Sequence, residues 1–343
     1  MRIGVFLPNW IGDVVMATPA LRALRKLAGG EGRLVGIMRP YVAEVLAGTN
    51  WLDEVVLYKP KAEQPEYRWA SARQKLRREQ LDVAVLFTNS LRTAWMAWRS
   101  GARERIGFSR ELRSWLLTKR LPMRRSGKRR YETPPIDGYL RLATAAGCGE
   151  ESRTLELATT PADEAAADKV WKSLDFALDE QPILFNPGGG FGPSKTWPVE
   201  HFAALAQRLV GDFRSKVLVN CGPSERDLAR QIVTLAASPN VSSLAGFEVP
   251  LGLSKAVIKR ARLLVTTDSG PRFFGVAFQR PVVSLFGPTS PAATPTYFDR
   301  ETTLSLALDC QPCMERTCPL VHHKCMRDLT VETVYAAAAR HLE

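Results

Sequence analysis

The chain has 343 residues, 45% of them hydrophobic, and carries a formal net charge of +12. A chain of this length can bury a sizeable core and fits two domains better than one. No apolar stretch approaches the roughly 18 residues that a membrane-spanning helix requires, so a transmembrane helix is excluded. The first apolar run ends at Pro8 and leads into Asn9 and Asp13, so we interpret it as a strand rather than a signal peptide and expect a cytoplasmic protein.

The positive charge is concentrated in one stretch. Between Arg99 and Arg130, twelve arginines and lysines stand against two glutamates, which is a net charge of +10. Such a stretch attracts phosphate groups on nucleic acid, on a membrane surface or on a substrate, and the alternative is an ordinary solvated surface. The part from Leu121 to Pro135 contains three prolines and predicts a mobile loop.

Short apolar runs alternate with segments of helical periodicity in two successive series. In the first series, strands are predicted at 5–7, 34–38 and 83–87, and helices at 18–27, 41–47 and 91–99. After a polar stretch at 152–162, strands are predicted at 183–185, 217–219, 263–265 and 282–286, and helices at 201–210, 225–235 and 272–278. A helix over 331–342 ends the chain.

This alternation is typical of parallel sheets that are covered by helices. We therefore predict an α/β protein with two facing, doubly wound, Rossmann-like domains at residues 1–160 and 161–343. Ligands are expected at the carboxyl ends of the strands.

The first motif with chemical content is Pro8-Asn9-Trp10-Ile11-Gly12-Asp13, which joins the first strand to a helix. Trp10 and Ile11 make this turn apolar, and an apolar setting raises the pKa of a carboxyl group toward that of a useful general base. The G-x-G-x-x-G spacing of a dinucleotide site is missing. Asp13 is therefore a candidate base, and the alternative is that it only caps the helix.

The second motif occupies residues 186–198 and reads Asn-Pro-Gly-Gly-Gly-Phe-Gly-Pro-Ser-Lys-Thr-Trp-Pro. Its four glycines let backbone amides approach a ligand closely, and Lys195 adds a positive charge suited to phosphate. It does not match the P-loop pattern. We predict a phosphate-binding loop, and the alternative is a flexible loop with an exposed lysine.

The third motif, Thr266-Thr267-Asp268-Ser269-Gly270-Pro271, also follows an apolar strand and opens a helix. Pro271 suits the first helical turn, and the amides before it offer partial positive charge to a diphosphate. The alternative is an N-cap role for Asp268 or Ser269. All three motifs fall at strand-to-helix junctions on the same edge of a sheet, which favours a ligand-binding role for each.

Four cysteines cluster near the end of the chain, at Cys310, Cys313, Cys318 and Cys325. In a reducing cytosol they are expected to be ligands rather than disulfides. Their spacing suits a structural zinc ion or an iron–sulfur cluster, and the alternative is unliganded thiols. A catalytic zinc is not expected, because the protein would fill every ligand position.

The chain resembles the ADP-heptose:lipopolysaccharide heptosyltransferases of glycosyltransferase family 9, particularly heptosyltransferase II. The resemblance runs nearly from end to end. The motifs that carry it are Asn9 to Asp13, Thr88-Asn89-Ser90, Arg105-Ile106-Gly107-Phe108, residues 187–198, Leu244-Ala245-Gly246, Thr267 to Gly270 and Phe286 to Pro291.

The resemblance implies a GT-B fold and inverting transfer of heptose from ADP-heptose to the phosphorylated inner core of lipopolysaccharide, with no cofactor for catalysis. Asp13 is the expected base, and Lys195 is expected to neutralise the departing diphosphate. The expected donor-binding residues in the second domain are Gly188, Gly189, Gly190, Ser194, Gly246, Asp268, Ser269, Gly270 and Arg272. The expected acceptor-binding residues in the first domain are Asn9, Asn89, Ser90, Arg92, Arg103 and Arg105.

One position departs from the family pattern. The family usually has a histidine near the donor diphosphate, three residues after the glycine of the Asp-Ser-Gly motif, and here that position is Phe273. We expect the preceding Arg272 to take over the phosphate contact, and the alternatives are a changed donor or reduced activity. The basic stretch is expected to meet the phosphorylated lipid at the cytoplasmic face of the inner membrane.

Two other functions are weighed against this one. A second member of the same family would use a different sugar donor or acceptor. A nucleic-acid-binding protein would use the stretch from Arg99 to Arg130, with the cysteine cluster as a zinc module. The second alternative gives the three junction motifs no purpose, so we expect no nucleic-acid partner.

Overall fold

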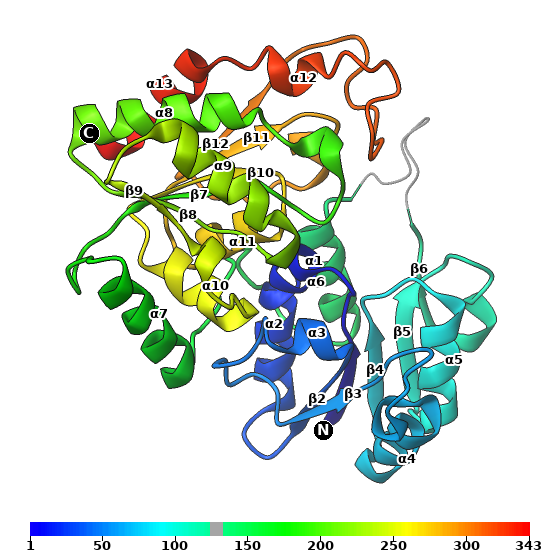
Figure 1. The fold of residues 1–343 in the computed structure, drawn as a ribbon. Helices are drawn as coiled ribbons and strands as arrows, with labels where there is room; N and C mark the ends of the chain where they lie inside the picture. Colours follow the sequence, from blue (N-terminus) through cyan, green and yellow to red (C-terminus); the bar gives the residue numbers. More distant parts are fainter. Residues whose placement is uncertain (124–132) are drawn as a thin grey trace. The chain divides into compact units, whose positions relative to one another are not determined.

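The computed structural model describes residues 1–123 and 133–343, so residues 124–132 of the basic stretch and of the predicted mobile loop lie outside the described residues. The chain divides into two compact units, Met1–Ala158 and Thr159–Glu343. Each unit contains one parallel sheet with helices against it (Figure 1). Within the described part of the chain, no helix is both long and apolar enough to span a bilayer.

The first unit is built on a six-stranded sheet in the order β3-β2-β1-β4-β5-β6. Its strands are β1 (Arg2–Phe6), β2 (Arg33–Met38), β3 (Glu54–Leu57), β4 (Val83–Leu86), β5 (Glu104–Phe108) and β6 (Lys119–Leu121). Its α-helices are α1 (Ile11–Met16), α2 (Thr18–Ala28), α3 (Pro40–Ala43), α4 (Trp69–Glu79), α5 (Leu91–Ser100) and α6 (Pro135–Ala145).

The second unit repeats this plan with the sheet order β12-β11-β10-β7-β8-β9. Its strands are β7 (Ile183–Asn186), β8 (Val217–Val219), β9 (Val241–Ser243), β10 (Leu263–Thr267), β11 (Val282–Phe286) and β12 (Glu301–Ser305). Its α-helices are α7 (Pro161–Ser173), α8 (Val199–Phe213), α9 (Arg226–Ala236), α10 (Leu251–Lys259), α11 (Gly270–Ala277), α12 (Lys324–Arg327) and α13 (Val331–Leu342).

The central strands are apolar on both faces because helices cover both sides of each sheet. In β1, Ile3 and Val5 are fully buried, and every residue of β10 and β11 is buried. Burial of both faces is typical of parallel sheets and explains why these strands are continuous apolar runs. The predicted α/β class with two doubly wound sheets is confirmed.

Helix boundaries follow local chemistry. Pro19 lies in the first turn of α2. At α7, the Thr160 side chain accepts a hydrogen bond from the Asp163 amide, and the Asp163 carboxylate accepts one from the Thr160 amide.

Two predicted boundaries differ from the structure. The chain is already helical from Ile11, and α3 is one short turn instead of a helix over 41–47.

Each sheet reverses its strand order next to its first strand. In the first unit, β2 lies on one side of β1 and β4 on the other; in the second, β8 and β10 flank β7. Doubly wound folds bind ligands outside the carboxyl ends of the strands at such points. The loops after β1, β4, β7 and β10 hold the predicted motifs.

Candidate active-site residues

Asp13 lies in the first turn of α1, directly after the carboxyl end of β1. It does not cap this helix, because the N-cap is Trp10 and no side chain caps it. Burial raises the pKa of Asp13 to about 6, although a hydrogen bond from the Tyr139 hydroxyl opposes the rise. A carboxylate with a pKa near 6 is ionised at neutral pH and still basic enough to accept a proton in a reaction.

Tyr139 is a partner of Asp13 that the sequence interpretation missed. It comes from α6, more than a hundred residues along the chain, and α6 packs against α1. Its ring lies 4.9 Å from that of Phe87. Burial and the Asp13 charge raise the pKa of the Tyr139 hydroxyl well above its usual value. The hydroxyl therefore stays protonated and acts as a hydrogen-bond donor to Asp13.

Asn89 and Ser90 follow the carboxyl end of β4, which pairs in parallel with β1. The Ser90 hydroxyl caps α5 by accepting a hydrogen bond of 3.2 Å from the Thr93 amide. The side-chain oxygen of Asn89 accepts one of 3.0 Å from Arg113. This hydrogen bond from Arg113 holds the Asn89 side chain in place.

Arg113 belongs to the basic stretch but does not lie on the surface. Its side chain is fully buried, and it also donates to the carbonyl oxygens of Thr88 and Phe108 at 2.5 and 3.1 Å. Burial lowers the pKa of Arg113 to about 10, so the guanidinium remains charged at neutral pH. Arg113 therefore supports the loop after β4, and composition alone gave no sign of this.

The other predicted acceptor residues lie at two opposite edges of the sheet. Asn9 lies at the carboxyl edge, where its carbonyl accepts a hydrogen bond from the Tyr41 hydroxyl, and the exposed Arg92 lies in the first turn of α5. Arg103 and Arg105 are placed wrongly by the prediction. They lie at the amino end of β5, where Arg103 approaches Asp82 and Arg105 donates to the Ala102 and Leu116 carbonyls at 2.7 Å. In a parallel sheet this is the edge opposite to Asp13.

In the second unit, the glycine-rich loop follows β7 and is fitted closely to its neighbours. A Cβ atom on Gly188 would lie 2.3 Å from the Glu225 carboxylate, and one on Gly189 would lie 2.9 Å from the Ser269 Cβ. A Cβ on the exposed Gly190 would meet nothing within 4 Å. The loop is therefore packed on its inner side and open on its outer side.

A buried amide network holds this loop. The Asn186 side chain donates to the Gly188 carbonyl at 3.0 Å and to the Ser269 hydroxyl at 3.2 Å, and Asn220 donates to Asn186 at 2.9 Å. These residues end β7 and β8, so the network ties three loops together at one edge. Sequence interpretation missed it because the partners come from different strands.

Glu225 is a second residue that the sequence interpretation missed. It lies beyond the carboxyl end of β8, beside Gly188, and its carboxylate accepts a hydrogen bond of 2.8 Å from the Gly222 amide. An acidic group at this position of a nucleotide-binding sheet is suited to binding ribose hydroxyls.

Lys195 and Asp268 form an ion pair that links the loop after β7 to the loop after β10. The ammonium lies 2.6 Å from a carboxylate oxygen of Asp268 and also donates to the Asp268 carbonyl at 2.7 Å. The Thr289 hydroxyl donates to the same carboxylate oxygen at 2.7 Å. The side chains of Lys195 and Asp268 are 12% and 11% exposed, so both can still reach a ligand. The pair brings the second and third motifs into contact.

Arg272 and Phe273 lie below the surface. Arg272 is 1% exposed, and its guanidinium binds the Glu301 carboxylate at 2.6 and 3.1 Å and lies 3.6 Å from Asp268. Phe273 is 5% exposed and stacks on the Arg272 guanidinium. The expectation that Arg272 contacts the diphosphate directly is therefore corrected: Arg272 supports Asp268 from inside.

The remaining donor residues differ in accessibility. Ser269 is the N-cap of α11 without using its side chain, and Gly270 opens the helix, so their amides point out of its N-terminus. Gly246 is exposed in the loop after β9. Ser194 is buried instead, with its hydroxyl donating to the Glu315 carbonyl at 2.6 Å and its amide to the Arg316 carbonyl at 3.1 Å. Both donors of Ser194 are therefore occupied by the cysteine-rich tail.

The cysteine-rich tail, residues 307–325, packs on the glycine-rich loop. A cavity of about 20 Å³ is lined by all four clustered cysteines together with His322 and His323. His323 also forms a hydrogen bond of 2.7 Å with the Ser194 carbonyl. Among the residues that the structure describes, no three His, Cys, Asp or Glu side chains are arranged as metal ligands.

Known proteins are similar to this chain over most of its length. The chain is 28% identical to lipooligosaccharide heptosyltransferase 2 of Haemophilus influenzae over 89% of each chain. It is 26% identical to lipopolysaccharide heptosyltransferase 2 of Escherichia coli over 97% of this chain and 96% of that one.

Two solved structures share the fold. E. coli ADP-heptose lps heptosyltransferase II superposes with a TM-score of 0.79 at 22% identity, covering 100% of this chain and 98% of that one. A glycosyltransferase family 9 protein of Veillonella parvula gives a TM-score of 0.83 at 24% identity, covering 99% and 97%. These likenesses establish the GT-B fold. The model of glycosyltransferase family 9 (heptosyltransferase) matches residues 69–324, and the chain belongs to this family.

Proposed function

We propose that this glycosyltransferase moves heptose from ADP-heptose to the inner core of lipopolysaccharide with inversion at the anomeric carbon. The observation that carries the proposal is the position of the candidate residues. Asp13 lies where the strand order of one sheet reverses, and the Lys195–Asp268 pair lies where that of the other reverses. The names of the relatives support heptose as the sugar.

Asp13 is the proposed general base. It accepts the proton of an acceptor hydroxyl while that oxygen forms a bond to the anomeric carbon. The bond from this carbon to the diphosphate breaks on the opposite face, and ADP leaves with the electron pair. The pKa of about 6 and the hydrogen bond from Tyr139 support this role, because they keep the carboxylate basic and oriented.

The second unit supplies the proposed donor site. Lys195 and the amides of Gly188 to Gly190, Ser269 and Gly270 neutralise the diphosphate, so that the departing charge needs no metal ion. Asp268 binds sugar hydroxyls, Glu225 binds the ribose, and the exposed Gly246 lies beside the nucleotide. The open outer side of the glycine-rich loop supports this assignment.

The first unit supplies the proposed acceptor site. Asn9, Asn89, Ser90 and Arg92 follow the carboxyl ends of β1 and β4, the same edge of the sheet at which Asp13 lies. Arg92 provides a positive charge for a phosphorylated sugar. A lipid acceptor requires contact with the membrane, which we expect at its cytoplasmic face.

Donor binding tests this assignment without an acceptor. Calorimetric titration with ADP is expected to show roughly 10- to 100-fold weaker binding for Lys195→Met than for wild type, because a charge-assisted contact is lost. Lys216→Met is the matched control, since Lys216 pairs with Glu180 away from the glycine-rich loop. Equal ADP affinity in all three proteins would exclude the proposed phosphate contact.

The cysteine-rich tail is proposed to hold a structural metal, either zinc or an iron–sulfur cluster, outside the chemistry. The support is that all four thiols line one cavity together with His322 and His323. Elemental analysis of the purified protein is expected to find about one zinc per chain. Metal-free protein with full thermal stability would rule this out.

A different sugar is the second candidate. Its support is Phe273, which replaces the family's usual histidine near the donor and is buried in this chain. Transfer assays with ADP-heptose, ADP-glucose and other sugar nucleotides separate the two candidates, because the true donor gives the highest kcat/KM.

A further inference from the structure

Helix α5 carries an exposed apolar stripe on the side away from its sheet. The inward face consists of the buried residues Thr93, Ala94, Met96, Ala97 and Ser100. On the outward side, Leu91, Trp95 and Trp98 are 44%, 37% and 45% exposed. Since successive helical residues are rotated by about 100°, these three side chains fall within a sector of about 60°. We call Leu91, Trp95 and Trp98 the aromatic stripe.

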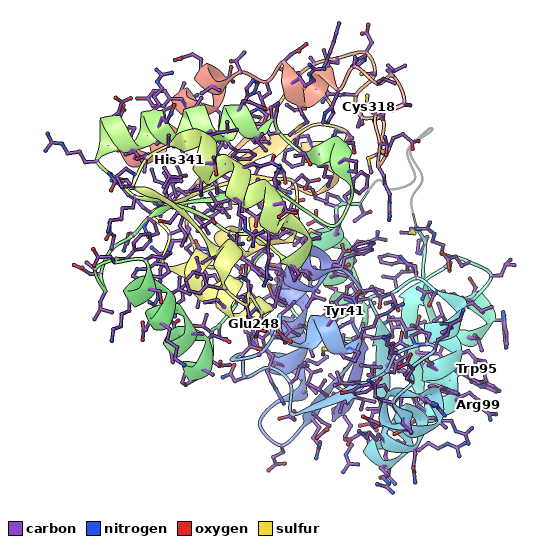
Figure 2. All side chains as sticks on the ribbon, in the orientation of Figure 1. Tyr41, Trp95, Arg99, Glu248, Cys318 and His341 are labelled. Carbon is purple, nitrogen blue, oxygen red and sulfur yellow. The ribbon has the colours of Figure 1, made fainter. Side chains whose placement is uncertain are left out.

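The rings of the stripe are held by a cation and by a second tryptophan. The Arg99 guanidinium lies 5.5 Å from the centroid of the Trp95 ring and 5.7 Å from that of Trp98, and Trp95 and Arg99 project from α5 beside each other (Figure 2). The Trp69 ring of α4 lies 5.3 Å from that of Trp95. These contacts fix the orientation of the exposed rings, so the stripe is a preformed surface.

The surroundings of the stripe are strongly cationic. Helices α4 and α5 pack against each other and carry six basic residues against one acidic residue, Glu79. The basic residues are Arg73, Lys75, Arg77, Arg78, Arg92 and Arg99. Near α5, the segment around Ser114–Leu116 adds the exposed Leu112 and Trp115, at 90% and 67%.

This composition favours one class of partner. Tryptophan rings prefer the headgroup level of a bilayer, and flanking arginines and lysines bind anionic phosphates there. Protein interfaces are also enriched in tryptophan and arginine, so the choice of a bilayer rests on the surplus of positive charge beside the exposed rings, six basic residues against one acidic residue. An exposed apolar patch with a basic border therefore matches an anionic membrane surface.

We propose that the aromatic stripe and the basic residues of α4 and α5 dock this enzyme on an anionic bilayer. The inference rests on the proposed function, because a lipid acceptor is presented at a membrane surface. It assigns the membrane contact to α4 and α5 rather than to the whole stretch from Arg99 to Arg130, in which Arg113 is buried.

Vesicle co-sedimentation of the full chain tests the proposal. The vesicles contain phosphatidylethanolamine and phosphatidylglycerol, with phosphatidylcholine vesicles as the uncharged comparison. Wild type is expected to bind the anionic vesicles, and Leu91→Ser/Trp98→Ser is expected to bind at least about fivefold more weakly. Arg77→Glu/Arg78→Glu is expected to lose the preference for anionic lipid. Leu178→Ser/Leu235→Ser, which removes exposed apolar side chains of the second unit, is the matched control and binds like wild type.

Two outcomes overturn the proposal: equal binding of wild type and the stripe variant to anionic vesicles, or no binding of wild type. A wild-type dimer in solution that the stripe variant abolishes, without any vesicle binding, identifies a second copy as the partner instead. Circular dichroism and ADP affinity check that the variants fold. Stripe-dependent vesicle binding without heptose transfer to a short detergent-soluble acceptor would refute the proposed function and leave the docking surface standing.

Discussion

Asp13 combines a catalytic position with a cost in stability. Its pKa is about 6 in the folded chain and 3.8 in the unfolded one, so the unfolded chain loses its proton first as the pH rises. Stability therefore falls between pH 4 and pH 6, and the full cost remains above pH 6. We predict that Asp13→Asn raises the melting temperature at pH 7.5 and lowers turnover at least about 100-fold.

Asp53 provides the control of opposite sign. Its pKa lies below the usual value although burial opposes this, because the Leu34 amide and Arg25 bind its carboxylate. Asp53→Asn is therefore expected to lower the melting temperature at pH 7.5.

The effect of Asp13→Asn should depend on pH. Below about pH 4 the rise in melting temperature caused by Asp13→Asn should vanish, since the wild-type Asp13 carboxyl is then protonated in both the folded and the unfolded chain. A normal transfer rate in Asp13→Asn contradicts the assignment of the base.

Tyr139 tunes the base. Because its hydrogen bond lowers the pKa of Asp13, removal of the hydroxyl should raise that pKa further. We predict that Tyr139→Phe moves the acidic limb of the kcat/KM profile to higher pH and leaves ADP affinity unchanged. Tyr335→Phe, which removes a hydroxyl bound to Asp212 in the second unit, serves as control. If the acidic limb of the kcat/KM profile lies at the same pH in Tyr139→Phe as in wild type, the Tyr139 contact does not set the pKa of the reacting carboxylate.

Sequence alone singled out the candidate residues that lie within motifs. Asp13 and Lys195 follow strand ends within readable motifs, so strand direction was enough to place them. Tyr139 was missed because Asp13 is distant from it in sequence, and Glu225 was missed because it lies outside the three motifs. Arg103 was misassigned because charge composition does not tell at which edge of a sheet a residue lies.

The glycine-rich loop is an element whose glycines are not equivalent. Gly192 has a φ of +148°, and a Cβ there would lie 2.6 Å from the Arg316 carbonyl oxygen of the tail. We predict that Gly192→Ala costs about 1–3 kcal/mol of stability and weakens ADP binding, because the loop must move away from the tail. Melting curves and calorimetric titration measure both effects.

Gly190→Ala is the matched variant in the same loop. A Cβ at Gly190 meets open space, so the melting temperature should remain that of wild type. If Gly190→Ala destabilises the protein as much as Gly192→Ala, the close packing between loop and tail does not explain the glycine at 192.

Periodicity predicted the central strands β1, β2, β4, β7, β8, β10 and β11, because apolar runs in a parallel sheet are continuous, and it missed the outer strands β3, β5, β6, β9 and β12. It also missed the helices α4, α6, α7 and α10. It failed where packing decides the boundary. Helix α1 begins at Ile11 although Trp10 provides no side-chain cap, and α3 stops after one turn although its apolar pattern continues to Ala47. Tertiary contacts override local preference at such short elements.

At the level of the whole molecule, the two units share one plan and differ in their chemistry. Both sheets reverse their strand order beside the first strand, which puts the motif loops at equivalent places. The first unit offers a base and polar side chains there, and the second offers backbone amides, a lysine and carboxylates. This division supports separate acceptor and donor roles, as the family resemblance implies.

Transfer of heptose is the central claim, and one measurement tests it most directly. Purified protein is mixed with ADP-heptose and a heptose-deficient inner-core acceptor in the presence of a metal chelator, and ADP release and product mass are followed. We predict stoichiometric ADP and a product heavier by one heptose, with ADP-glucose a much poorer donor. No transfer from ADP-heptose, or faster transfer from another sugar nucleotide, would contradict the account.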